Sequence, residues 1–168
     1  MEHILSMACP NNLYEVHDFQ QMSGASRKSI LKFVECLRWA MAEADSVFVF
    51  RSHDHLQGHP SVIDVANNIG IHYSPEVLVH FKQHNRILKI RAIDGGPIFQ
   101  IHLSEAANRE VFANAFKISI RDFKRSVPLC DEMLIDDPVY DQFDYLFVKE
   151  GRVILWTDIH ELLLFKVN

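Results

Sequence analysis

The stretch from Phe143 to Asp158, FDYLFVKEGRVILWTD, constrains the fold of this chain more than any other part. It contains two apolar runs, Tyr145–Val148 and Val153–Trp156, and neither alternates between apolar and polar positions. A continuous apolar run is typical of a strand that is covered on both faces of its sheet. Between the runs, Gly151 can adopt the positive φ that a tight hairpin turn needs. The stretch therefore predicts a hairpin at the centre of a sheet.

The rest of the chain predicts helices and strands in mixed order. Apolar residues at helical spacing, with Ser or Pro at the start of some segments, predict helices at Arg27–Ala44, Ser74–Gln83 and Glu105–Phe116. Short apolar or alternating runs predict strands at Val47–Phe50, Arg86–Ile93, Ile98–Leu103 and Lys117–Phe123. The two strands between 86 and 103 are expected to form a second hairpin across Asp94-Gly95-Gly96-Pro97.

Three kinds of segment remain open or irregular. Residues 1–25 are expected to be irregular, and residues 124–142 to form a long loop. Residues 62–71 fit a short helix or a turn, and residues 159–167 a short helix or a last strand. Together these patterns predict a single α+β domain over residues 1–168, with one mixed, largely antiparallel sheet flanked by helices.

Composition limits the classes of partner and the cellular compartments that are expected for the protein. The 168 residues are 48 % hydrophobic and carry a net charge of −5 without a long block of like charges, which argues against a broad nucleic-acid surface. The three cysteines, Cys9, Cys36 and Cys130, are far apart and form no CxxC motif, so reduced thiols in a cytoplasmic protein are expected. There is no secretory signal pattern and no apolar run of about 18 residues, so no membrane span is expected.

A histidine cluster follows directly after one predicted buried strand. His53 and His55 are two residues apart, and His59 follows four residues later. Loops at strand ends are common places for sites, and three neutral imidazoles can bind zinc, iron or nickel. The pattern resembles the His-x-His-x-Asp-His run of metallo-β-lactamase-like hydrolases, from which it departs at Gln57 and Gly58. Loop histidines without a metal are the alternative interpretation.

A small basic patch is the second candidate site. Arg121, Lys124 and Arg125 lie within five positions and could hold a phosphate or another anionic ligand. The alternative is an ordinary solvated edge.

The layout from Ser104 onward resembles the last part of a phospholipase D-like domain. A predicted helix feeds a predicted strand, a loop follows, and a pair of strands closes the chain. The signature of that superfamily is His-x-Lys-x-x-x-x-Asp, with the Asp near the turn between two strands. If Glu150 stands at the Asp position, then Phe143 and Tyr145 stand where the His and the Lys would be. The resemblance therefore implies a degenerate domain that binds but does not catalyse, since neither side chain suits covalent phosphoryl transfer.

Three functions remain open from the sequence. The first is a small binding or regulatory module without catalytic activity; the composition permits a protein partner or a homodimer without requiring either. The second is a small metal-dependent hydrolase that uses His53, His55 and His59 with a divalent transition metal. The third is a toxin- or nuclease-like enzyme that uses a single histidine with Arg51 or Arg121. No complete catalytic set is evident in the sequence, which favours the binding module.

Overall fold

The computed structural model describes residues 5–9, 14–18, 27–50, 61–73, 76–81, 86–91, 98–130, 144–158 and 163–167. Three helices are present in these residues: α1 Arg27–Glu43, α2 Ser61–Ile69 and α3 Ala106–Cys130. Ten strands accompany them: β1 Leu5–Cys9, β2 Tyr14–Asp18, β3 Ser46–Phe50, β4 Ile71–Tyr73, β5 Glu76–Phe81, β6 Arg86–Arg91, β7 Ile98–His102, β8 Asp144–Lys149, β9 Arg152–Asp158 and β10 Leu163–Val167.

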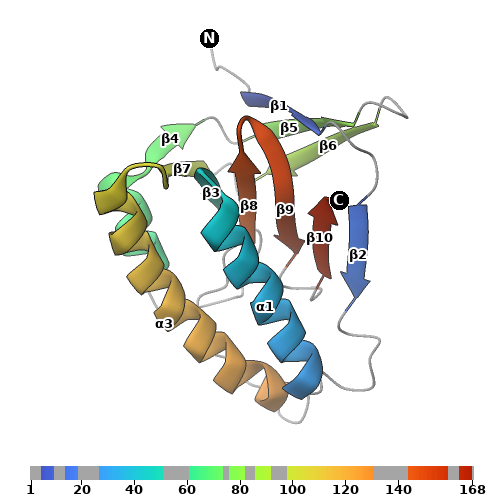
Figure 1. Cartoon of the computed structure of the whole chain (residues 1–168), viewed down its shortest axis with the longest axis vertical. Coiled ribbons are helices and arrows are strands. Elements are labelled where there is room, and N and C mark those ends of the chain that lie inside the picture. Colours follow the sequence, from blue (N-terminus) through green and yellow to red (C-terminus); the bar gives the residue numbers. More distant parts are fainter. Residues whose placement is uncertain are drawn as a thin grey trace.

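All ten described strands belong to one sheet, which divides at β9 (Figure 1). The undivided part has the order β4-β7-β3-β8-β9, and every neighbour in it is antiparallel. The first residue of β9, Arg152, pairs with Ala8 of β1, and β5 and β6 continue the sheet from there. The other end of β9 pairs with β10, which pairs with β2. Only the pairings of β1 with β5 and β9 are parallel among those described, so the fold is α+β with a single mixed, largely antiparallel sheet.

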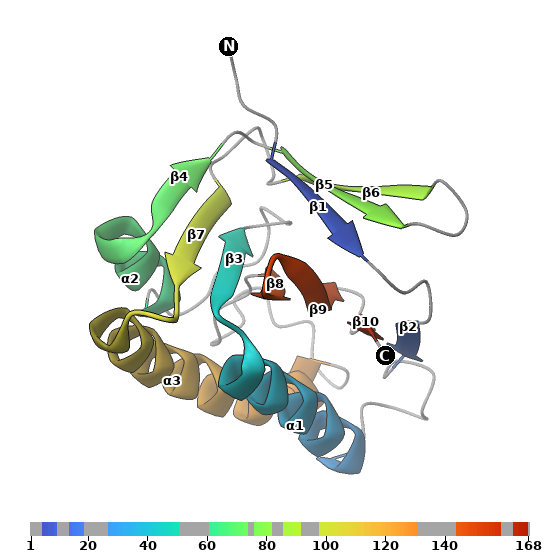
Figure 2. The ribbon, with the colours of Figure 1, turned by 45° about the horizontal axis from the view of Figure 1, so that its top comes forward.

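The helices lie together on one face of the β3–β8–β9 part of the sheet, while β1, β5 and β6 lie on the other side of it (Figure 2). Helix α1 contacts α3 and β8, and α2 packs between α3 and β7. The central strands are covered on both faces, because all five residues of β3 and the first five residues of β8 are buried. This confirms the expectation that continuous apolar runs mark covered strands.

The core between helices and sheet is rich in aromatic side chains. The ring of Phe116 on α3 meets Tyr145 edge-on at a centroid distance of 5.4 Å and also contacts Phe147 at 6.2 Å. Phe112, one helical turn earlier, stacks on Phe116 at 5.7 Å. Offset or edge-to-face pairs of this kind stabilise a core by about 0.5–1.5 kcal/mol beyond the area that they bury. The cluster fixes α3 over β8.

The predicted central hairpin is confirmed. Strands β8 and β9 pair antiparallel, with Lys149 opposite Arg152, so Glu150 and Gly151 form a two-residue turn. Both turn residues have positive φ, 51° for Glu150 and 73° for Gly151. Positive φ at both central positions matches the right-handed twist of the strands that the turn joins. The first helix and the strand at 47–50 are likewise confirmed as α1 and β3.

The predicted strand Lys117–Phe123 is wrong, because α3 continues without a break from Ala106 to Cys130. The loop predicted from residue 124 is wrong as far as residue 130 for the same reason. Phe112, Phe116 and Ile120 are all buried, and their spacing of four residues places them on one helical face. The short alternating pattern around Ile118 and Ile120 fitted both periods, and packing of the longer apolar stripe against the sheet selects the helix.

Three other predictions of local structure are corrected. The predicted helix Ser74–Gln83 is a strand, β5, which pairs with β1 and β6 on its two sides. Strand β7 pairs with β3 and β4 rather than with β6, so the expected hairpin between 86 and 103 does not form. The N-terminal residues expected to be irregular contain β1 and β2. The two open segments resolve as helix α2 and, at the end of the chain, strand β10.

Candidate functional site

The histidines predicted to bind a metal, His53, His55 and His59, lie outside the described residues. The described part of the chain contains no group of three or more His, Cys, Asp or Glu residues that could hold a metal ion. The chain reaches the histidine segment from β3, whose last residue, Phe50, lies opposite Asp144 in the sheet. The metal prediction therefore stays a prediction.

The basic patch predicted for a phosphate lies on a helix. Arg121, Lys124 and Arg125 are all part of α3, where spacings of three and four residues place their positions on one helical face. Arg121 is exposed, while the side chains of Lys124 and Arg125 lie outside the described part of the structure. These three positions were expected in a strand and in the loop after it, and they lie in α3 instead. Binding of an anion there stays a prediction.

A buried polar pair lies where β8 begins and β9 ends. The Asp144 side chain belongs to a residue that is only 2 % exposed, and its Oδ1 accepts a hydrogen bond of 2.9 Å from the Thr157 hydroxyl. The backbone N–H of Tyr145 donates to the same hydroxyl oxygen at 3.0 Å. Buried polar groups are stable when they are hydrogen-bonded in this way. The pair ties the ends of two neighbouring strands together, and an Asp at the head of an apolar run is the only sign of it in the sequence.

Arg109 joins the end of α1 to the start of α3. Its guanidinium donates to the carbonyl oxygen of Leu103 at 2.8 Å, to that of Met41 at 2.9 Å and also to that of Ala44. The last carbonyls of a helix have no partners within the helix, and a cation at this end is stabilising. Arg109 therefore has a structural role, because its guanidinium hydrogen-bonds the backbone carbonyls at the C-terminal end of α1. Sequence reasoning missed this role because two of the three partners, Ala44 and Met41, lie 65 and 68 residues away in the chain.

The tip of the central hairpin is held by Glu43, the last residue of α1, and by Asp45, which lies between α1 and β3. The Lys149 ammonium forms an ion pair of 2.8 Å with the Glu43 carboxylate, and both side chains are 45 % exposed. This hydrogen bond, together with the charge of Lys149, lowers the pKa of Glu43, and Glu43 in turn raises the pKa of Lys149. The Asp45 carboxylate accepts a hydrogen bond of 2.7 Å from the backbone N–H of Glu150. These charges fix the hairpin tip against the junction of α1 and β3.

The outer face of α1 presents apolar side chains to solvent. We use this name for the exposed α1 residues Leu31, Lys32, Glu35, Arg38, Trp39, Ala42 and Glu43. Leu31 and Trp39 are 39 % and 36 % exposed, two of the four large hydrophobic residues that are exposed in the described part of the chain. Lys166 of β10 places its ammonium 4.4 Å from the centre of the Trp39 ring. Such a cation–π contact favours this orientation of the exposed indole by about 0.5–1 kcal/mol.

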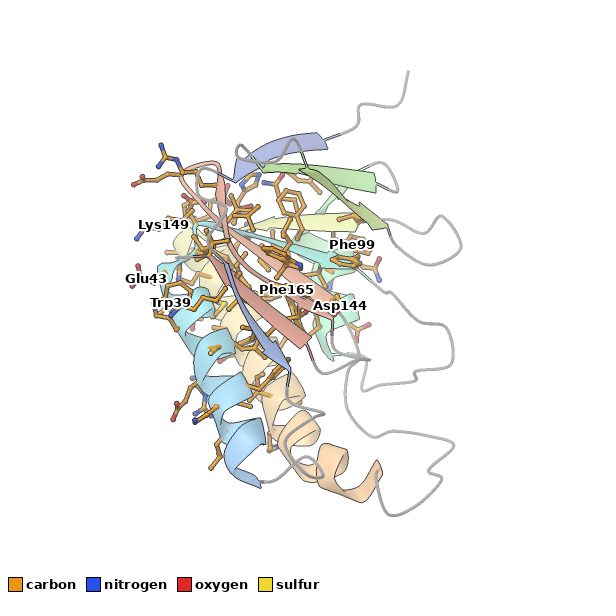
Figure 3. All side chains as sticks on the ribbon, turned by 90° about the vertical axis from the view of Figure 1, so that its right-hand side faces the viewer. Trp39, Glu43, Phe99, Asp144, Lys149 and Phe165 are labelled. Carbon is orange, nitrogen blue, oxygen red and sulfur yellow. The ribbon has the colours of Figure 1, made fainter. Side chains whose placement is uncertain are left out.

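The outer face of α1 and the buried polar pair lie on different sides of the molecule. Figure 3 shows Trp39, Glu43 and Lys149 along one side, with Asp144 and Phe99 on the other. The α1 side combines two exposed apolar side chains, Leu31 and Trp39, with charged neighbours. It is therefore the candidate contact surface of the described structure.

Comparison with protein-family models, with curated proteins and with solved structures finds no match to this chain. Among the described residues, no helix is both long enough and apolar enough to cross a membrane.

Proposed function

We propose that this chain is a small binding or regulatory module without catalytic activity, and that it contacts a protein partner through the outer face of α1. The observation that carries the proposal is the exposed indole of Trp39, which the Lys166 ammonium orients from the neighbouring strand. Tryptophan and arginine are enriched among the residues that dominate binding energy at protein interfaces. Trp39 and Arg38 are adjacent on this face.

The use of the polar groups in the described structure also supports a role without catalysis. Arg109, Asp45 and Thr157 all hold backbone groups or turns in place. The resemblance to phospholipase D-like domains stays a proposal and points the same way. Tyr145, which would stand at the position of the phosphate-binding lysine, is 1 % exposed and packs against Phe116 in the core. Only the β8–β9 hairpin of the layout behind this resemblance remains, because residues 117–123, which were predicted to form the strand before it, are part of helix α3.

Site-specific photo-crosslinking in cells tests the contact surface. A photoreactive phenylalanine analogue replaces Ala42 on the outer face of α1 or, as a control, the exposed Asn114 on α3. We expect a discrete cross-linked species from position 42, its loss in a Trp39→Ala background, and no such species from position 114. Equal cross-linking at both positions, or cross-linking that does not depend on Trp39, would contradict the proposal. The mass of the species distinguishes a second copy of this chain from another protein.

The hydrolase that the histidine cluster suggests is tested separately. Elemental analysis of the purified chain is compared with that of a His53→Ala/His55→Ala variant, together with phosphoester and amide hydrolysis by both proteins. The binding function predicts no stoichiometric transition metal and no hydrolysis that the double substitution removes. A near-stoichiometric metal that is lost in the variant together with hydrolysis would replace the binding function with metal-dependent catalysis.

A further inference from the structure

We propose that the partner of the outer face of α1 is a second copy of this chain, packed antiparallel on α1 about a two-fold axis. The inference rests on the proposed function, because it names the partner for the same surface. Its basis is a stripe of four exposed residues whose sizes and charges are complementary to themselves when the helix is reversed.

The stripe consists of Leu31, Glu35, Arg38 and Ala42. Their spacing of four, three and four residues places them along one side of the helix, as do the inward positions of a coiled coil. The side chains on the opposite side of the helix, among them Phe33, Leu37 and Ala40, are buried in the core. The stripe therefore points directly away from the sheet.

When the α1 helix of a second copy lies antiparallel to the first, one register pairs the charged residues of the stripe with opposite charges and its apolar residues with each other. With the two-fold axis between Glu35 and Arg38, Glu35 lies opposite Arg38 of the second copy, and the reciprocal pair forms by symmetry. Leu31 then lies opposite Ala42 of the second copy, so that a large side chain meets a small one. A parallel arrangement would instead place Glu35 against Glu35 and Arg38 against Arg38, where like charges repel. The charges thus select the antiparallel dimer.

The neighbours of the stripe fit this arrangement. Trp39 follows Arg38 and lies at the flank of the seam, where its ring, held by Lys166, can cover the contact. Glu43 is already paired with Lys149 and stays outside the seam. A two-fold contact uses the same patch on both subunits, as most soluble homo-oligomers do. A seam of this length spans about 17 Å of helix, which predicts a weak and concentration-dependent dimer.

A charge-swap series, measured by sedimentation velocity on the full chain over a range of concentrations, tests the register. Glu35→Arg and Arg38→Glu each place like charges opposite each other twice, so we expect each to weaken self-association by about tenfold or more. An equimolar mixture of the two variants pairs opposite charges again, so it should form a heterodimer that native mass spectrometry can identify. The double variant Glu35→Arg/Arg38→Glu should recover the homodimer.

Matched controls separate the seam from a general effect of charge. Lys32→Glu is the control for Arg38→Glu, because it changes the net charge by the same amount but lies on the flank of the face. Glu110→Arg is the control for Glu35→Arg, because it makes the same change of charge on α3. Both controls should associate as the wild type does. All substituted positions are exposed on helices, and circular dichroism confirms that the variants are folded. Leu31→Glu provides an independent variant, which should also weaken the dimer.

Three results would overturn the proposal: a wild-type chain that stays monomeric at all concentrations, association that the single swaps leave unchanged, or single swaps that do not recover on mixing. A monomer that still shows Trp39-dependent cross-linking to another protein would refute the second copy but retain the binding function. A wild-type chain that shows neither self-association nor cross-linking would refute both the dimer and the proposed binding function.

Discussion

The Asp45 carboxylate accepts a hydrogen bond of 2.7 Å from the backbone N–H of Glu150, 105 residues later in the chain. The backbone N–H of Asp45 donates to the Val148 carbonyl at 3.0 Å. The Asp45 carbonyl accepts hydrogen bonds from the N–H groups of Leu103 and Ser104 at 2.8 and 3.1 Å. Asp45 therefore joins the end of α1, the hairpin turn and the start of the connection to α3. The turn needs this support because Glu150, which has φ of 51°, occupies a backbone region that Asn and Gly adopt more readily.

Removal of this acceptor is expected to loosen the hairpin turn. Asp45→Ala should lower the free energy of unfolding by about 1 kcal/mol, the usual net value of one hydrogen bond. Asp45→Asn retains an acceptor oxygen and should lose less than half of that amount. Urea denaturation followed by circular dichroism measures both variants. Equal losses in the two variants would show that the acceptor oxygen does not support the turn.

Substitution of Arg109 is expected to lower the free energy of unfolding by more than substitution of Asp45. Arg109→Met leaves the carbonyls of Met41, Ala44 and Leu103 without this donor, and we expect a loss of about 3 kcal/mol because hydrogen bonds from a charged group are the stronger kind. Arg109→Lys should recover only part of it, since one ammonium cannot reproduce the planar fork. Lys117→Met on the same helix is the control, because Lys117 is exposed. A Lys variant as stable as the wild type would contradict this explanation.

The ion pair between Glu43 and Lys149 predicts a dependence on pH with a defined sign. The pKa of Glu43 is lowered in the folded chain, so its stabilising effect is present above the unfolded pKa of about 4.3 and is lost as the pH falls through the lower folded value. The pKa of Lys149 is raised, so its effect is present below about 10.4 and is lost as the pH rises through the folded value. The stability difference between the wild type and Lys149→Gln should therefore shrink in acid, and also in high salt.

Titration by NMR measures the same pair directly. In Lys149→Gln the carboxyl of Glu43 should titrate at higher pH than in the wild type, because its hydrogen bond and the nearby positive charge are both removed. Arg152→Gln removes the positive charge of the residue opposite Lys149 in the hairpin but keeps the ion pair, so it is the control. An unchanged titration of Glu43 in Lys149→Gln would mean that the pair does not persist in solution.

The sequence predicts the centre of this fold better than its periphery. The strand at β3 and the β8–β9 hairpin are short, apolar throughout and bounded by turn residues, so local pattern is sufficient for them. Strand β5 shows the opposite case. Its signals for a helix start are local, but its structure depends on pairing with β1, about 70 positions earlier, which no local pattern reveals.

The candidate site depends even more on distant contacts. Trp39 looks like one more residue of an amphipathic helix until β10 brings Lys166 against its ring. Arg109 and Asp45 likewise carry ordinary local patterns, and their roles arise only when α1, α3 and the hairpin turn meet. The histidine cluster is the reverse, since its motif is clear in the sequence but lies outside the described structure.

Two glycines are expected to resist substitution for different reasons. A Cβ at Gly70 would overlap the Ala66 carbonyl oxygen and lie 3.1 Å from the Cβ of Phe99, so Gly70→Ala should cost about 2 kcal/mol through crowding. A Cβ at Gly151 would have nothing within 4 Å, but φ there is +73°, so Gly151→Ala should cost about 1 kcal/mol through backbone conformation alone. Thermal unfolding compares them. Asn at 151, which tolerates positive φ, should recover stability, whereas Asn at 70 should be no better than Ala.

The buried pair of Asp144 and Thr157 should behave as a unit. Thr157→Val keeps the shape of the side chain but removes the hydroxyl that donates to Asp144 and accepts from the N–H of Tyr145. Because Asp144 is 2 % exposed, water cannot replace the lost donor freely, and we expect a loss of about 2 kcal/mol. Thr157→Ser retains the hydroxyl and should lose about 1 kcal/mol for the methyl group alone.

A double-mutant cycle in urea separates this pairing from simple loss of packing. Once Asp144→Ala has removed the carboxyl group, Thr157→Val no longer deprives the buried Asp144 side chain of this hydrogen bond, so its cost should fall by about 1 kcal/mol or more. The loss at the Tyr145 N–H remains in both backgrounds, which is why the cost should not vanish. Additive losses would show that the hydroxyl and the carboxylate do not stabilise each other, and that the 2.9 Å contact contributes little to holding the ends of β8 and β9 together.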